Sequence, residues 1–209
     1  MDGTKALALD AFAERYGLGM LRFDYSGTGS SGESFDQGTL ARWLEEALAC
    51  LDQLISGRLI LIGSSMGGWI ALHLARLRRE RVQALVGIAA APDFTNWGFT
   101  ADQKAELRSA GLVQEPNPDG SEPTFITMDF FSSGQQLLVL DSEIEIDCPV
   151  RLLHGENDNE VPLEVSFRTM RALRSADVQL NVIKGGGHRL SEPNEIGAIL
   201  RTVDALLEL

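Results

Sequence analysis

The feature that most constrains the fold is an apolar run at residues 59–62 that ends abruptly at GSSMG, residues 63–67, with a helical pattern directly behind it. This is the G-x-S-x-G pattern of a nucleophile elbow, in the strand-to-helix setting that such an elbow requires. The turn is so sharp that the central serine, Ser65, is forced out of the backbone, and small residues must flank it on both sides. The helix points its positive end at the reacting group and leaves the backbone N–H of Met66 free to bind an oxyanion. The pentapeptide therefore predicts Ser65 as nucleophile and Met66 as one oxyanion donor.

Composition excludes several other classes of protein. The 209 residues are enough for one sizeable core, and 44% hydrophobic with 23% charged residues is ordinary for a globular domain, so we expect a single domain over residues 1–209. Acidic residues outnumber basic ones by 30 to 18, giving a formal charge of −12, which argues against a nucleic acid partner. Two cysteines are too few for a disulfide framework, and neither a leader nor a membrane span is recognisable, so we expect a cytosolic protein.

Strand-like apolar runs alternate with helical patterns along most of the chain. This alternation indicates an α/β fold, a mostly parallel sheet with helices on both faces. The helical patterns have apolar residues at every third or fourth position, and turn signals bound the strand-like runs. The predicted strands are 20–24, 59–63, 82–90, 150–154 and 178–184, and the predicted helices are 4–16, 39–55, 65–79, 163–173 and 195–207.

The interval at about residues 92–147 interrupts the alternation. It is long, carries Pro116, Pro118 and Pro123, and holds six of the fourteen aromatic residues. Since a structureless loop of this length is improbable in a compact domain, we expect a small helical cap over the sheet. Rings of this cap, among them Phe94, Trp97 and Phe130, would then line a substrate pocket, although buried aromatic rings also serve simply as core.

A serine nucleophile needs a histidine base, and the chain has only three histidines. His73 lies inside the helix that follows the elbow, too far along its axis to reach Ser65. His154 ends a predicted strand, where a structural role is usual. His188 follows three glycines after the last strand, in a loop that can bring the backbone close to another element. We therefore predict His188 as the base.

The acid that orients this base should follow a strand at the carboxyl edge of the sheet, where ligands bind. Asp158 lies in the loop after the strand at 150–154, between Glu156 and Glu160, which we interpret as solvated loop charges. Asp93, just after the strand at 82–90, is the alternative. We predict Asp158, because the chain order serine, acid, histidine with the acid after the penultimate strand is the commoner arrangement.

Taken together, these residues resemble the α/β-hydrolase-fold serine hydrolases, with the elbow, the segment His154-Gly155-x-x-Asp158 and the His188 loop in the family order. One subfamily is especially similar, that of the mitochondrial palmitoyl-protein thioesterase, also described as an acyl-glucuronide esterase, and its bacterial relatives. The resemblance implies cleavage of an ester or thioester by Ser65, Asp158 and His188, with no metal and no cofactor. It runs from residue 3 to the C-terminal helix and is carried by GTKA at 3–6, RFDYSG at 22–27, GSSMGGW at 63–69, APDF at 91–94 and CPVRLLHG at 148–155.

The resemblance also implies that this chain is truncated at its N-terminus. Relatives carry further strands before the segment at 3–6, together with a glycine-containing loop that supplies the second oxyanion N–H. The missing strand would lie between the strand at 20–24 and the strand at 59–63, so its loss leaves a gap of roughly 10 Å or forces those two strands to pair. The alternative function is therefore an impaired or non-catalytic hydrolase-fold protein that lacks part of the oxyanion hole and binds acyl ligands without turning them over.

A second glycine motif suggests a different function. Residues 27–32 read GTGSSG, which matches the G-x-G-x-x-G pattern of dinucleotide-binding domains after a strand. The last glycine of such a site opens a helix, whereas residues 33–38 continue as loop, and no acidic residue ends a second strand about twenty positions later. We therefore interpret the motif as a glycine-rich turn beside the active site, and we predict no nucleotide cofactor.

Overall fold

The fold is taken from a computed structural model of the whole chain, in which residues 1–115 and 124–208 are described. The main sheet has the order β1-β2-β5-β6, and all its neighbouring strands are parallel. Its strands are β1 (Leu59–Ser64), β2 (Val82–Ile88), β5 (Val150–Gly155) and β6 (Val178–Ile183). The sheet confirms the predicted α/β class and four of the five predicted strands.

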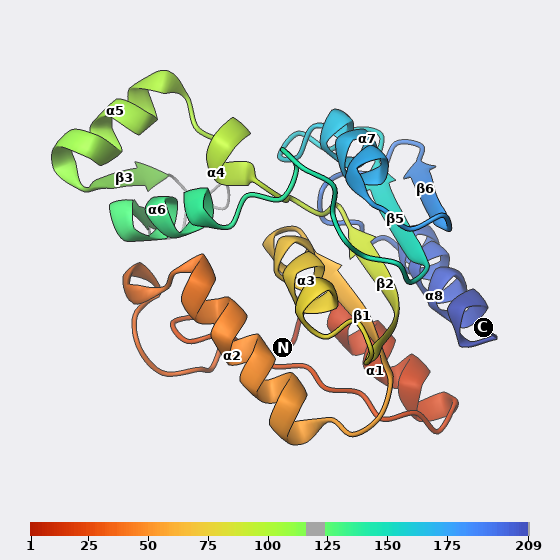
Figure 1. The fold of residues 1–209 in the computed structure, drawn as a ribbon. Helices are drawn as coiled ribbons and strands as arrows, with labels where there is room; N and C mark the ends of the chain where they lie inside the picture. The colour runs from red at the N-terminus through yellow and green to blue at the C-terminus, as the bar shows by residue number, and fades with distance from the viewer. Residues whose placement is uncertain (116–123, 209) are drawn as a thin grey trace.

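Helices cover both faces of this sheet (Figure 1). On one face, Leu85, Val150 and Leu152 pack in a core with α2, α3 and α7. On the other face, Val86 and Leu153 pack with α1 and α8. Alternating residues of the strands thus enter opposite cores, as the period-two geometry of a strand requires. The helices are α1 (Thr4–Arg15), α2 (Leu40–Leu54), α3 (Met66–Leu77), α7 (Leu163–Ala172) and α8 (Pro193–Leu207), which confirms the five predicted helices.

The predicted strand at residues 20–24 is wrong. The segment makes no strand pairing, and β1 is an edge strand that pairs with β2 alone among the described residues. Of the two outcomes expected for a sheet without the intervening strand, direct pairing with β1 is therefore not found. An apolar run becomes a strand only where a neighbour satisfies its backbone N–H and C=O groups, and such a neighbour is a property of the fold rather than of the run itself.

The interval between β2 and β5 holds helices, as predicted (Figure 1), and also a pair of antiparallel strands that the sequence did not suggest. The antiparallel strands β3 and β4 pair with each other and not with the main sheet. Residues 116–123 of the expected cap, which include Pro116, Pro118 and Pro123, lie outside the described residues. The elements of this interval are α4 (Phe94–Trp97), α5 (Ala101–Ala110), β3 (Leu112–Glu115), β4 (Thr124–Thr127) and α6 (Met128–Gln136).

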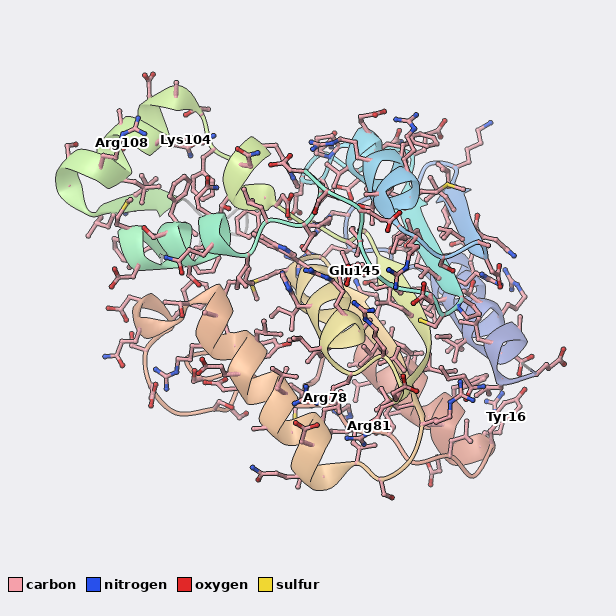
Figure 2. The ribbon with its side chains drawn as sticks, viewed as in Figure 1. Tyr16, Arg78, Arg81, Lys104, Arg108 and Glu145 are labelled. Atoms are coloured by element: carbon pink, nitrogen blue, oxygen red, sulfur yellow. The ribbon has the colours of Figure 1, made fainter. Side chains whose placement is uncertain are left out.

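Two arginines hold α2 against the turn that follows α3 (Figure 2). Arg81 donates hydrogen bonds to the carbonyls of Leu51 and Ile55 at 3.1 and 2.5 Å, which satisfies acceptors at the end of α2 that have no partner inside the helix. Arg78 binds the Asp52 carboxylate with Nε–Oδ1 at 2.9 Å. These contacts fix the far end of the helix that begins at the elbow. Across the described ranges, no helix combines the length and the apolar character needed to cross a membrane.

Candidate active site

Ser65 lies in the sharp connection between β1 and α3. Its φ of 53° and ψ of −124° are uncommon for a residue with a side chain, and they turn the hydroxyl out of the backbone path. The backbone is held on both sides by the end of β2: the Ser65 N–H donates to Ile88 O at 2.9 Å, and the Ala91 N–H donates to Ser65 O at 3.0 Å. The strain at Ser65 is therefore maintained by its attachment to the neighbouring strand.

The small residues around the elbow are not equally necessary. A Cβ at Gly63 would overlap the backbone of Gly67 and Gly68, and a Cβ at Gly68 would lie 2.5 Å from the Cβ of Ala90. A Cβ at Gly67 would meet nothing within 4 Å. The expectation that both flanking glycines of the motif avoid clashes thus holds for Gly63 and not for Gly67. The close packing instead involves Gly63 and Gly68, where α3 passes β1 and the end of β2.

This difference predicts opposite outcomes for two matched substitutions. Gly63→Ala should lower the free energy of unfolding by about 1–3 kcal/mol or prevent folding, because the new methyl group meets backbone that has no room to move. Gly67→Ala should change it by less than about 1 kcal/mol, since an open helical site favours alanine over glycine. Urea unfolding monitored by circular dichroism measures both values. Equal losses in the two variants would contradict the assignment.

The N-terminus of α3 supplies a hydrogen-bond donor beside Ser65. Met66 is the first residue of the helix, so its backbone N–H has no acceptor inside the helix. The aligned peptide dipoles make this end of the helix positive, which favours negative charge next to Ser65. The geometry is suitable for an oxyanion on an acyl carbon bound to the Ser65 hydroxyl.

The loop that carries His188 is packed against the loop that carries Asp158. A Cβ at Gly155 would overlap the Gly186 carbonyl, so the two loops approach at backbone distance. The Asn157 N–H donates to Gly186 O at 2.8 Å, and the Gly185 N–H donates to the Glu156 carboxylate at 3.0 Å. The three glycines before His188 therefore bring its loop close to another element, as predicted, and that element is the end of β5.

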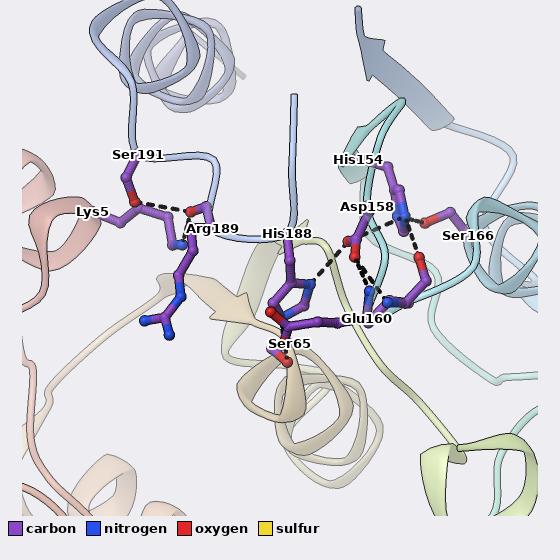
Figure 3. Close-up of polar contacts among 10 residues, drawn as sticks. Lys5, Ser65, His154, Asp158, Glu160, Ser166, His188, Arg189 and Ser191 are labelled. Carbon is purple, nitrogen blue, oxygen red and sulfur yellow. Dashed lines mark hydrogen bonds and ion pairs between the residues drawn. The ribbon is translucent and has the colours of Figure 1, made fainter. Parts of the chain in front are cut away.

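Three predicted residues meet above the carboxyl ends of the strands (Figure 3). His188 Nδ1 lies 2.9 Å from Asp158 Oδ2, and His188 Nε2 lies 3.0 Å from Ser65 Oγ. A carboxylate only accepts, so Nδ1 carries the proton and Nε2 is left to accept from the serine hydroxyl. The Asp158 side chain is fully buried and that of His188 is 12% exposed. The arrangement has the connectivity of a nucleophile, a base and an orienting acid.

The environment of Asp158 favours its charged form. Burial by itself raises the pKa of this carboxyl, but hydrogen bonds from the Val161 N–H, from His188 and from the Glu160 N–H outweigh burial and leave the pKa below its ordinary value. Both backbone donors bind Oδ1 at 2.9 Å, so Oδ2 is directed at the imidazole. The carboxylate is therefore charged and held in one orientation.

Asp93, the alternative acid, and His73 do not contact His188 but bind backbone groups of residues 137–140. Asp93 is buried, and its two oxygens accept the N–H groups of Val139 and Leu140, both at 2.8 Å. His73 Nε2 lies 2.9 Å from the carbonyl of Leu137. Burial raises the pKa of Asp93 and lowers the pKa of His73. Both side chains bind the segment that returns from α6 to the sheet, and Asp158 rather than Asp93 contacts His188.

Two side chains near His188 were not identified from the sequence. Glu160, interpreted as a solvated loop charge, is 64% exposed, but its Oε2 lies 3.6 Å from His188 Nε2. Lys5, at the start of α1, donates a hydrogen bond to the carbonyl of Arg189, next to His188 (Figure 3). Burial, followed by the charge of Arg189, lowers the pKa of Lys5. The position of Glu160 two residues after Asp158 could have indicated its contact with His188. No neighbouring residue in the sequence indicated the contact of Lys5 with Arg189.

Two of the predicted pocket residues, Phe94 and Phe130, belong to one aromatic cluster, whereas the indole N–H of Trp97 donates to the carbonyl of Pro92 at 2.8 Å. Phe94 contacts the rings of Trp69, Phe99 and Phe130 at centroid separations of 5.7–5.9 Å. Phe130 is 5% exposed, while Phe94 and Trp97 are half-buried. Trp69 is fully buried. The contacts of Phe94 with Trp69 and Phe130 thus link α3 to α4 and α6.

The glycine motif at residues 27–32 forms a turn closed on itself. The Gly27 N–H donates to Gly32 O at 2.8 Å, and the Ser30 N–H donates to Asp24 Oδ2 at 3.1 Å. A Cβ at Gly29 would overlap this carboxylate, so the glycine is needed for the turn itself. A short 3₁₀ turn (Phe35–Gln37) rather than a long helix follows. In the described parts of the chain, no three His, Cys, Asp or Glu side chains are grouped to hold a metal ion.

Comparison with known proteins places the chain among hydrolases. The family described as alpha/beta hydrolase fold matches residues 8–120. The mitochondrial palmitoyl-protein thioesterase ABHD10 of Homo sapiens is 36% identical over 212 residues, covering 100% of this chain and 69% of the relative. The crystal structure of a putative hydrolase from Agrobacterium vitis S4 has a TM-score of 0.93 and 40% identity, covering 99% of this chain and 83% of that one. The mouse alpha/beta hydrolase domain-containing protein 10 has a TM-score of 0.92 and 36% identity, covering 100% and 85%.

The comparisons correct the predicted location. A cytosolic protein was expected, yet the curated relatives that match the whole chain are mitochondrial by name. Charge and cysteine content could not indicate this, because a cellular address is read from a separate targeting signal rather than from the composition of the folded domain.

Proposed function

The chain belongs to the α/β-hydrolase family, and on this basis we propose that it is a serine hydrolase that cleaves a carboxylic ester or thioester through an acyl-enzyme on Ser65. The observation that carries the proposal is the pair of contacts at His188, 2.9 Å to Asp158 and 3.0 Å to Ser65. The thioesterase activity in the name of the ABHD10 relatives supports the same chemistry.

In the proposed mechanism, His188 Nε2 removes the proton of the Ser65 hydroxyl as Oγ attacks the acyl carbon. The Met66 N–H stabilises the oxyanion that forms, and Asp158 holds the Nδ1 proton and stabilises the imidazolium. Collapse of the tetrahedral intermediate expels the alcohol or thiol, which takes its proton from Nε2. Water activated by the same nitrogen then attacks the acyl-enzyme and releases the carboxylic acid.

We further propose that the acyl group contacts the aromatic rings of Phe94, Trp97 and Phe130. Phe94 packs against Trp69 on the helix that begins at the elbow, so an acyl chain that leaves Ser65 along this helix would meet apolar surface. A palmitoyl chain, as in the name of the curated relatives, is one acyl group that such a surface would accept.

The second candidate is a hydrolase-fold protein that binds acyl ligands with impaired turnover. It is favoured by the position of β1 at the edge of the sheet and by Met66 as the one oxyanion donor identified within residues 1–115 and 124–208. Loss of one oxyanion donor lowers kcat about 10²–10³-fold. Such a protein would bind an acyl ester but would acylate slowly.

One experiment separates these candidates. The purified chain should react with a fluorophosphonate probe within minutes and should hydrolyse p-nitrophenyl esters and acyl thioesters, with chain-length preference read from kcat/KM across a panel from acetyl to palmitoyl. Rapid labelling requires an organised base and acid beside the serine. Binding of palmitoyl esters without labelling or turnover would instead support the impaired protein.

A further inference from the structure

A second buried histidine lies directly behind the catalytic carboxylate (Figure 3). His154 is near the end of β5, and its side chain, like that of Asp158, has no exposed surface. His154 Nε2 lies 2.9 Å from the carbonyl of Val161 and 3.4 Å from Asp158 Oδ2. Its Nδ1 lies 2.8 Å from the Oγ of Ser166, on α7. The proposed mechanism assigns no role to this ring.

The partners of His154 determine which nitrogen carries the proton. The carbonyl of Val161 only accepts, so Nε2 donates. In the neutral ring Nδ1 then accepts, and the Ser166 hydroxyl donates to it. Ser166 is 3% exposed, so water does not compete freely for this contact. The Val161 carbonyl thus fixes the tautomer and directs the Nε2 hydrogen toward the Asp158 loop, while the Ser166 hydroxyl holds the Nδ1 side of the ring.

This hydrogen acts on Asp158 in two ways. Through the Val161 carbonyl it holds the residue whose own N–H binds Asp158 Oδ1. It also places a positively polarised N–H edge 3.4 Å from Oδ2, the oxygen that accepts from His188. Inside a buried site these contacts are little screened. Both contacts favour the ionised carboxylate and the orientation that meets the imidazole.

We propose that His154 is a positioning residue for the acid of this site, with Ser166 as the residue that orients His154 in turn. The proposal rests on the proposed serine hydrolase function. It extends the polar chain by two side chains, so that the chain runs from Ser166 on α7 through His154, Asp158 and His188 to Ser65 (Figure 3). If His154 served only to fill the core, its substitution would leave the kcat of the folded variant and the pH dependence of kcat unchanged.

The test compares three variants with the wild type. His154→Phe keeps a ring and removes both nitrogens, and we expect kcat to fall about a hundredfold with KM nearly unchanged, as for a misplaced catalytic group. The acidic limb of the pH–rate profile should also move to lower pH, because the imidazolium of His188 loses part of its carboxylate stabilisation. His154→Gln, which can still donate from its Nε2, should recover part of kcat. Ser166→Ala should lower kcat about twofold to tenfold and shift the limb in the same direction.

Thr169→Val is the matched control. Thr169 is on the same helix, is 1% exposed and donates its hydroxyl hydrogen bond to Val165 O, away from the site. Its kcat and pH limb should equal those of the wild type. If His154→Phe does not fold, the test is the comparison of kcat and of the pH–rate profile between Ser166→Ala and Thr169→Val. A kcat within twofold of the wild type and an unmoved limb in the folded variants would overturn the positioning role, whereas a wild type that neither labels nor turns over would overturn the serine hydrolase function itself.

Discussion

Replacing Ser65 with alanine should lower kcat for ester hydrolysis by about 10⁶-fold, the scale of losing a serine nucleophile whose base and acid remain in place. The Oγ that lies 3.0 Å from His188 Nε2 is the atom that would form the acyl-enzyme, and no other group takes its place in the proposed mechanism. The Ser65→Ala variant should also lose all labelling by a fluorophosphonate. Initial rates with a p-nitrophenyl ester and gel fluorescence of the labelled protein measure the two effects.

Ser64→Ala is the control for this experiment. Ser64 is the last residue of β1 and the immediate neighbour of the nucleophile, yet it has no role in the proposed mechanism. Its variant should label at a rate close to that of the wild type. If Ser65→Ala retained labelling, or if Ser64→Ala alone lost it, Ser65 would not be the nucleophile.

Asp158→Asn should lower kcat by about 10⁴-fold while KM changes little. An amide can donate to His188 Nδ1, which would move the imidazole proton to Nε2, the nitrogen that must accept from Ser65. A stability difference should accompany the kinetic one. Because the pKa of Asp158 is lowered in the folded protein, its ionised form stabilises the fold at neutral pH, and this contribution is lost as the pH falls through the lowered pKa. The unfolding free energies of variant and wild type should therefore converge on acidification.

Asp93→Asn tests the alternative that Asp93 is the acid, with the same replacement of a carboxylate by an amide. The Asp93 carboxylate binds two backbone N–H groups, so an amide would leave one of these donors unsatisfied and lower stability by about 1–3 kcal/mol. The kcat of the folded variant should stay within a few fold of the wild type. Steady-state kinetics with denaturant unfolding distinguishes the two variants, and a 10⁴-fold loss in Asp93→Asn with activity retained in Asp158→Asn would reverse the assignment.

Much of this fold was predictable because its signals are local. The elbow at residues 63–67 combines a strand, a sharp turn and a helix in consecutive residues, and the chain order of Ser65, Asp158 and His188 needs only the ends of successive strands. The failures were not local. Residues 20–24 are as apolar as a strand, but strand formation depends on a pairing partner. The strands β3 and β4 pair only with each other, and the aromatic content of their interval carried no information about strand pairing.

From the sequence alone, Ser65 could be predicted as the nucleophile and His188 as the base, because a strained turn and a glycine-rich loop restrict which residues can occupy these positions. The tertiary structure was needed to show that Asp158 rather than Asp93 contacts His188, since both residues follow strands at the same edge of the sheet. It also decided that His154 lies behind Asp158 and that Glu160 reaches His188. Such contacts arise from the way the loops pack against each other. The pattern of neighbouring residues in the sequence does not indicate the distance between side chains on different loops.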